Sequence, residues 1–104
     1  AVKIIDWNLV RNLHGRHAED PLKEIACLQY MSNYGNDLHP NVIGSMEVLT
    51  DDHYIYSFMP FCSGGELFEH VERDGRFEEP VARYWFQQIL QGLYRLQQKG
   101  VCHR

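Results

Sequence analysis

The sequence predicts an α+β fold in which the strands come first and the helices come last. Residues 1–59 contain short runs of β-branched and aromatic side chains around one helical segment, whereas residues 66–104 show only helical patterns. Pro60 and the Gly64-Gly65 pair interrupt both patterns at the point of change. With 104 residues, 44% of them hydrophobic and 23% charged, the chain has the size and composition of one small globular domain.

The first half is predicted to be a strand, a loop, a helix and a strand hairpin. The predicted strands share an enrichment in β-branched and aromatic residues and lie at 1–7, 42–49 and 54–59. Residues 8–19 are polar and are predicted to be a loop. Asp20 is a suitable N-cap for a helix with Pro21 in its first turn, and Asn33-Tyr34-Gly35 is expected to end that helix.

The second half is predicted to contain two helices. The shorter one covers residues 66–73 and ends at Asp74-Gly75. The longer one begins at Pro80, carries an apolar stripe at helical spacing, and ends near Lys99-Gly100. No internal repeat or low-complexity segment interrupts this order.

Composition argues against several partners. The net charge of −4 and the absence of a basic patch argue against nucleic acid, and no apolar run approaches the length of about 20 residues that spans a membrane. The odd set of Cys27, Cys62 and Cys102 predicts reduced thiols in or near the core of an intracellular protein. Because the chain begins in a strand and lacks an initiator Met, we expect it to be a piece of a longer domain.

Five stretches occur in the order and approximate spacing of a known family. They are AVK, KEIACL, HPNV, FCSGGELF and RYWFQQILQGLYRLQQKGVCHR. Together they resemble the catalytic domain of eukaryotic-type protein kinases, and GGELF is closer to calcium/calmodulin-activated and AMP-activated serine/threonine kinases than to tyrosine kinases. The resemblance implies a partial kinase fold: residues 1–59 form part of the N-lobe, with its sheet and C-helix. Residues 60–65 form the hinge, and residues 66–104 start the C-lobe up to the His-Arg of the catalytic loop.

The resemblance assigns the phosphate-binding lysine and its partner to this chain. Lys3 would hold the α- and β-phosphates of ATP, and Glu24 would be its counter-charge. From the residues alone, Lys3 is also compatible with an exposed strand lysine and Glu24 with a solvated helix glutamate. The extra residues at 35–38 leave the register of Glu24 open.

The adenine side of the nucleotide site is implied in the same way. Ala1 would lie against the adenine ring and Met59 at the back of its pocket. The Pro60 carbonyl would accept a hydrogen bond from the adenine amino group, and the Cys62 N–H would donate one to a ring nitrogen, so the missing donor of proline is not needed. Glu66 would contact the ribose or a basic residue of a protein substrate; alternatively it is a first-turn acid that stabilises its helix.

The implied function is transfer of the γ-phosphoryl group of Mg²⁺-ATP to protein serine or threonine hydroxyls in the cell interior. The residues that the family uses as catalytic aspartate, Mg²⁺ ligands and glycine-rich loop have no counterpart in the 104 residues, so the chain by itself is expected to be inactive. The alternative is a pseudokinase or scaffolding domain that binds nucleotide or partners without catalysis.

Other candidate sites fail on local grounds, and no metal site is predicted. His14 and His17 form one close histidine pair without nearby cysteine ligands. Cys102 and His103 are neighbours in an extended segment and would point to opposite faces. The Ser63-Gly64-Gly65 stretch lacks the Gly-x-Ser-x-Gly frame of a nucleophile elbow.

Overall fold

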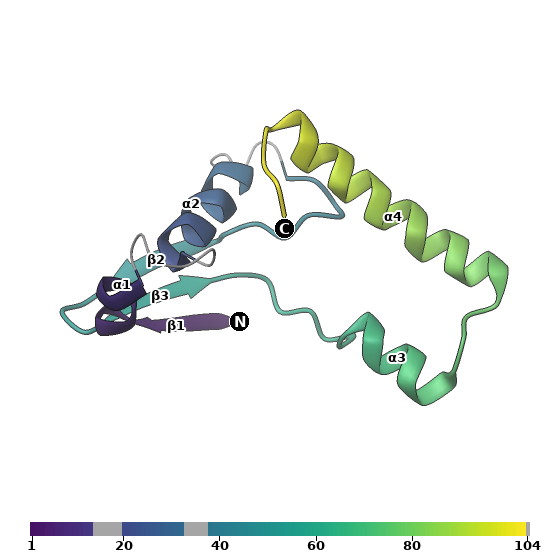
Figure 1. The fold of residues 1–104 in the computed structure, drawn as a ribbon, viewed down its shortest axis with the longest axis horizontal. Coiled ribbons are helices and arrows are strands. Elements are labelled where there is room, and N and C mark those ends of the chain that lie inside the picture. Colours follow the sequence, from purple (N-terminus) through teal and green to yellow (C-terminus); the bar gives the residue numbers. More distant parts are fainter. Residues whose placement is uncertain (14–19, 33–37, 104) are drawn as a thin grey trace. The chain divides into compact units, whose positions relative to one another are not determined.

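The computed structural model describes residues 1–13, 20–32 and 38–103 (Figure 1). The chain divides into two compact units, Ala1–Pro60 and Phe61–Arg104. Unit 1 contains all three strands and unit 2 contains only helices among its described residues. The predicted α+β class, with strands first and helices last, is therefore confirmed.

Unit 1 is built on a small antiparallel sheet. Its strands are β1 (Val2–Asp6), β2 (Glu47–Thr50) and β3 (Tyr54–Phe58), arranged in the order β1-β3-β2. The predicted hairpin is thus present as β2 and β3. Ser57 on the central strand lies opposite Lys3 of β1 on one side and Val48 of β2 on the other.

The turn between β2 and β3 is organised by Asp51. One of its carboxylate oxygens accepts hydrogen bonds from the N–H groups of His53 and Tyr54, each at 2.7 Å, and the other accepts one from the Tyr56 hydroxyl at 2.8 Å. These donors, the backbone groups first, lower the pKa of Asp51. The same contact, together with burial, raises the pKa of the Tyr56 hydroxyl.

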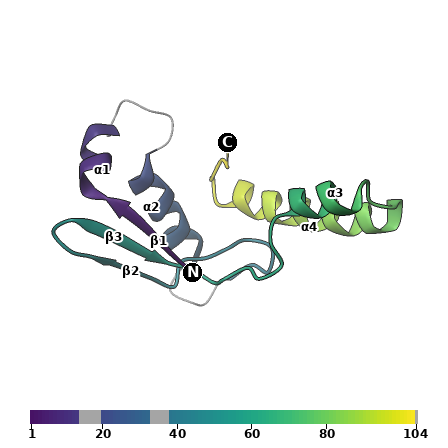
Figure 2. The same ribbon diagram turned by 90° about the horizontal axis from the view of Figure 1, so that it is seen from below.

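Two helices pack with the sheet of unit 1, α1 (Trp7–Leu13) and α2 (Pro21–Ser32). α2 lies along one face of the sheet (Figures 1 and 2). The hydrophobic cluster takes one residue from each of β1, α1, α2 and β3: Ile5, Val10, Ile25 and Ile55. Since successive strand residues face opposite sides, this packing leaves Val2 and Ile4 exposed on the other face.

Helix α1 corrects the prediction of a loop at residues 8–19. The Asp6 carboxylate accepts a hydrogen bond from the Asn8 N–H at 2.6 Å, which caps the first turn of the helix. The Trp7 indole donates to Thr50 Oγ1 and to the Asp51 carbonyl, both at 3.1 Å, and Val10 is buried in the core. These long-range contacts stabilise the helix. A helix of this length is not stable by its local sequence alone, and the polar segment in which it lies therefore did not predict it. The rest of the predicted loop, residues 14–19, lies outside the described residues.

Strand β2 is also shorter than the predicted 42–49. Ser32 at the end of α2 explains the difference, because its Oγ accepts a hydrogen bond from the Ser45 N–H at 2.5 Å and donates one to the Leu28 carbonyl at 2.7 Å. A Cβ at Gly44 would lie 2.7 Å from this Oγ, so only glycine allows the close approach. Ser45 is therefore bound to α2, and pairing with β3 begins only at the next residue, Met46, whose N–H donates to the Phe58 carbonyl at 2.9 Å. The predicted helix stop at residues 33–35 lies outside the described residues.

Unit 2 contains α3 (Leu67–Asp74) and α4 (Glu79–Gln98), each within one residue of its predicted bounds. Gly75 follows α3 with φ +79°, and its N–H donates to the Val71 carbonyl at 2.9 Å. After α4, Gly100 adopts φ +68° and the Val101 N–H donates to the Leu96 carbonyl at 2.9 Å. Both helices end by the glycine mechanism that the sequence indicated.

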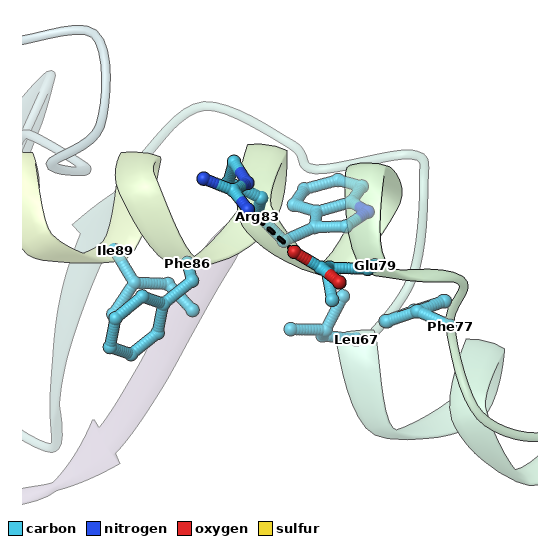
Figure 3. Close-up of a pocket in the computed structure, with 8 residues that line it drawn as sticks. Leu67, Phe77, Glu79, Arg83, Phe86 and Ile89 are labelled. Carbon is cyan, nitrogen blue, oxygen red and sulfur yellow. Dashed lines mark hydrogen bonds and ion pairs between the residues drawn. The ribbon is translucent and has the colours of Figure 1, made fainter.

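An open apolar groove of about 560 Å³ lies between α3 and α4 (Figure 3). Leu67, Phe77, Phe86 and Ile89 supply apolar side chains, and an ion pair between Arg83 and Glu79, 2.5 Å long, lies at its edge. None of the predicted nucleotide-site residues lines it. The groove is thus formed within unit 2, mainly along the apolar stripe of α4.

The cysteine prediction is wrong in part. Cys27, Cys62 and Cys102 are free thiols, as expected, but all three are exposed rather than in or near the core. Cys27 lies on α2, whose buried side chains are Ile25, Met31 and Ser32, so it occupies the outer side of that helix. Among the described residues, no helix is both long enough and apolar enough to cross a membrane.

Candidate functional site

A bidentate ion pair joins β1 to α2. Lys3 Nζ lies 2.7 Å from Oε1 and 2.7 Å from Oε2 of Glu24, across 21 positions of sequence. Lys3 projects from the sheet face that also carries the buried Ile5, the face along which α2 lies. Glu24 lies in the first turn of α2, where Ile25 anchors the helix in the core.

The beginning of α2 determines where Glu24 is placed. The Asp20 side chain accepts a hydrogen bond from the Leu22 N–H at 3.0 Å, and the Asp20 carbonyl accepts one from the Glu24 N–H at 3.1 Å. Capping defines the first residue of the helix, and the helical repeat then decides which side chains face the sheet. The register of Glu24, open at the level of sequence, is therefore one that brings its carboxylate to Lys3.

The pair is accessible to solvent. The side chain of Lys3 is 47% exposed and that of Glu24 is 48% exposed. Water screens such a pair, so that its contribution to stability is about 0–1 kcal/mol. The ammonium group is held in one orientation and remains accessible to a further anion.

Ala1 and Met59 are paired at the end of the β1–β3 ladder. The Ala1 nitrogen donates to the Met59 carbonyl at 2.7 Å, and the Met59 N–H donates to the Ala1 carbonyl at 3.0 Å. The ladder continues through Lys3 and Ser57, so Ala1, Lys3, Ser57 and Met59 lie on one face at alternate positions. Three residues with a predicted role in nucleotide binding are thereby brought together in unit 1.

The other predicted nucleotide-site residues lie along the irregular segment that follows β3. Pro60 is the last residue of unit 1, Cys62 belongs to unit 2, and both are exposed. Glu66 is the N-cap of α3 and is also exposed.

Glu66 is held by the backbone and side chains of α3. Its N–H donates to Glu69 Oε2 at 3.0 Å and its side chain faces the Glu69 N–H, which are the two halves of a capping box that stabilises α3; its carbonyl accepts the helical hydrogen bond from the His70 N–H at 3.4 Å. The preceding residue, Gly65, has φ +74°, and a Cβ there would lie 2.5 Å from the same Glu69 oxygen. Glycine is therefore required immediately before Glu66.

His70 was not singled out by the sequence, yet it binds the glycine segment. Its Nε2 lies 2.8 Å from the Gly64 carbonyl oxygen, and its Nδ1 lies 3.2 Å from Arg73 Nη2. The spacing in the sequence could have predicted this contact. His70 lies six residues after Gly64 and one helical turn after Glu66, so its side chain lies on the helix side nearest the segment that precedes α3.

Arg73 is fixed in turn by Asp74. Its Nε and Nη2 donate to the two carboxylate oxygens of Asp74 at 2.8 and 2.7 Å. These hydrogen bonds raise the pKa of Arg73 and lower that of Asp74. The guanidinium group that faces His70 is therefore always a hydrogen-bond donor.

Besides the loop and the helix stop noted above, three statements about candidate site residues concern positions that the structure does not describe. These are the histidine pair His14 and His17, the residues 35–37 of the segment that left the Glu24 register open, and Arg104. The other residue of the extra segment, Leu38, is described and exposed.

Comparison with known protein families matches residues 1–104, the whole chain, to the protein kinase domain. The chain belongs to the protein kinase family. Its small antiparallel sheet with α2 across one face is consistent with part of a kinase fold. The assignment of residues 1–59, 60–65 and 66–104 to lobes and hinge stays a prediction.

Individual relatives of this kinase chain are serine/threonine kinases. It is 36% identical over 104 residues to CBL-interacting serine/threonine-protein kinase 26 of Arabidopsis thaliana, with all of the chain and 22% of that protein covered. It is 33% identical over 108 residues to the probable serine/threonine-protein kinase fhkD of Dictyostelium discoideum, with all of the chain and 13% of that protein covered. The serine/threonine-protein kinase SRK2J of Arabidopsis is 41% identical over 66 residues, covering 64% of the chain and 20% of that protein. The matched region thus covers only 13 to 22% of the length of each of these three relatives.

Proposed function

We propose that this chain is the nucleotide-binding part of a serine/threonine protein kinase, which transfers the γ-phosphoryl group of ATP to a hydroxyl group of a protein. The observation that carries the proposal is the ion pair of Lys3 and Glu24, with Lys3 Nζ 2.7 Å from both carboxylate oxygens. Membership of the kinase family and the serine/threonine kinases among the relatives support the same reaction.

The geometry of the pair suits phosphate binding. A lysine has three N–H donors, and Glu24 uses part of this capacity while orienting the ammonium group. The exposed part of Lys3 is available to the α- and β-phosphate oxygens of a nucleotide. Because solvent screening leaves the pair little role in stability, its role is better explained by positioning a charge for a ligand.

The remaining residues of the site are proposed by resemblance to the family. In unit 1, Ala1 would lie against adenine, Met59 would lie at the back of its pocket, and the Pro60 carbonyl would accept a hydrogen bond from its amino group. In unit 2, the Cys62 N–H would donate to a ring nitrogen, and the exposed Glu66 carboxylate would contact the ribose or a basic residue of the protein substrate.

Mg²⁺ would supply charge neutralisation between the β- and γ-phosphates when bound with ATP. None of the site residues proposed for this chain is a Mg²⁺ ligand, and we propose that the metal ligands and the catalytic aspartate belong to other parts of the complete kinase domain. The ATP requirement places the proposed activity inside the cell.

A phosphoryl-transfer assay on the complete kinase domain that contains this chain tests the proposal. Wild-type domain should transfer phosphate from γ-labelled ATP to a basic serine/threonine peptide, and Lys3→Met should lower the rate at least about 100-fold. Lys23→Met is the matched control, because Lys23 is exposed on α2 and forms a long ion pair with Asp20, at 4.0 Å, away from Lys3 and Glu24. Retained activity in Lys3→Met would overturn the assignment, and nucleotide binding without any transfer by the wild-type domain would identify a pseudokinase.

A further inference from the structure

The carbonyl oxygen of Gly64 is held by a side chain from the helix that follows it. His70 Nε2 lies 2.8 Å from this oxygen, in a contact that is exposed to solvent. A carbonyl oxygen only accepts hydrogen bonds, so Nε2 must carry the proton in this contact. The ring therefore donates from α3 back to the Gly64-Gly65 pair.

Arg73 determines this tautomer. Its Nη2 lies 3.2 Å from His70 Nδ1, and a guanidinium group can only donate. Asp74 holds the guanidinium through two hydrogen bonds of 2.7 and 2.8 Å. With Nδ1 accepting from Arg73, the ring proton is on Nε2, which faces Gly64.

His70 also binds the carbonyl group of Glu66. The His70 N–H donates to the Glu66 carbonyl, and its ring holds the Gly64 carbonyl, so His70 binds the chain on both sides of Gly65. Gly65, at φ +74°, is the point at which this segment would otherwise rotate most freely. Glu66 follows immediately, and its N–H is bound by Glu69.

We propose that His70 is a positioning residue for Glu66: by fixing the Gly64 carbonyl it holds the Gly64-Gly65-Glu66 backbone in the conformation that presents the Glu66 carboxylate to the ribose hydroxyls of ATP. This inference rests on the proposed function of Glu66. The Arg73–Asp74 pair supports it by holding the ring tautomer, and Glu69 supports it by holding the Glu66 N–H.

The test compares ATP with 2′-deoxy-ATP as phosphoryl donors for the complete kinase domain. The ratio of the two kcat/KM values measures recognition of the ribose hydroxyl and is insensitive to the fraction of folded enzyme. Glu66→Ala should lower this ratio about tenfold, because a hydrogen bond to a carboxylate is lost. His70→Leu should lower it by a similar factor through a higher KM for ATP, with kcat nearly unchanged.

Three further variants separate positioning from a general effect on α3. His70→Gln places an amide N–H near the position of Nε2 and should restore most of the ratio. Glu72→Ala, on an exposed position of the same helix, should leave the ratio unchanged even if it lowers the melting temperature. The double variant Glu66→Ala with His70→Leu should be no worse than Glu66→Ala, since both changes remove the same contact.

The outcomes distinguish the positioning role of His70 from the ribose-binding role of Glu66. If Glu66→Ala leaves the ratio unchanged, the ribose role of Glu66 is wrong and the role of His70 is overturned with it. If Glu66→Ala lowers the ratio but His70→Leu does not, only the inference about His70 is overturned. A ¹⁵N spectrum of the folded domain that places the His70 proton on Nδ1 would also overturn it.

Discussion

Lys3 on β1 and Glu24 on α2 form a bidentate ion pair in which both side chains remain about half exposed. An ion pair in the protein interior would exclude further ligands, and a fully solvated one would not hold the lysine in a single orientation. This pair is intermediate: the ammonium group is oriented by the carboxylate and still accessible. That combination is suited to a group that binds the phosphates of a nucleotide.

Glu24→Gln should separate orientation from stability. The amide keeps the size of the side chain and removes its charge, so we expect the rate of phosphoryl transfer by the complete domain to fall about 10- to 100-fold. The free energy of unfolding should change by less than about 1 kcal/mol because the pair is screened by solvent. Kinetics combined with urea denaturation measure both quantities.

Glu47→Gln is a suitable control for this variant, since Glu47 is exposed on β2 and has no proposed role in the site. A Glu24→Gln domain with wild-type kinetics would show that Glu24 is a solvated helix glutamate, the alternative that the sequence alone left open.

Asp51 should make the β2–β3 turn sensitive to acid. Its pKa is lowered by hydrogen bonds from the N–H groups of His53 and Tyr54 and from the Tyr56 hydroxyl. A carboxyl group with a lowered folded-state pKa stabilises the fold above its unfolded value of about 3.8, and this contribution is lost as the pH falls through the folded-state value. A ¹³C titration of the complete domain should therefore show Asp51 ionised at pH values where free aspartate is largely protonated.

Asp51→Asn tests the same turn by mutation, because it keeps an acceptor oxygen and removes the charge. The variant should be less stable than wild type at neutral pH, and the difference should shrink below about pH 4. Asp52→Asn in the same loop serves as the control. An Asp51 titration midpoint at or above the ordinary value would contradict the hydrogen-bonded turn.

Gly44→Ala should destabilise the domain by about 1–3 kcal/mol through overpacking. The new Cβ would lie 2.7 Å from Ser32 Oγ and 3.0 Å from a methyl carbon of Leu38. Ser32 cannot move away cheaply, since its Oγ bonds both the Leu28 carbonyl and the Ser45 N–H. The free energy of unfolding in urea is the measurement.

Gly64→Ala is the matched comparison for stability, because a Cβ at that position meets nothing within 4 Å. Its free energy of unfolding should stay within about 0.5 kcal/mol of the wild type. Equal effects of the two alanines would show that the close approach of Gly44 to Ser32 is absent in solution.

The 104-residue chain by itself should be unstable or aggregate, and it should show no kinase activity. The hydrophobic cluster that the structure describes holds Ile5, Val10, Ile25 and Ile55, all in unit 1. Along α4, by contrast, apolar side chains are widely exposed, among them Phe86 at 61%. Exposed apolar surface of this kind promotes association.

Calorimetry and light scattering on the purified chain check this expectation, with the complete kinase domain as the comparison. A monodisperse monomer with a sharp cooperative melting transition would contradict it. The complete domain should bind less of a hydrophobic dye than the isolated chain, because the apolar stripe of α4 would then be covered.

Much of the fold could be predicted from local patterns. Pro21 after an aspartate indicated the start of α2, and Gly100 indicated the end of α4, because capping and glycine conformations depend on neighbouring residues. Helix α1 and the start of β2 could not be predicted in this way. Their causes are contacts of Trp7 with Thr50 and of Ser32 with Ser45, between residues far apart in the sequence.

The candidate site, too, was predictable in part from the sequence and in part only from the structure. Its residue types and order, from Lys3 to Glu66, were sufficient to suggest the kinase family, since a motif is a property of the chain itself. Only the folded structure decided that Glu24 faces Lys3, that the pair remains accessible, and that His70 holds Gly64. Each of these depends on which helix face is turned toward its neighbour. That choice is made by burial of residues such as Ile25 and by long-range hydrogen bonds, which no local stretch of sequence contains.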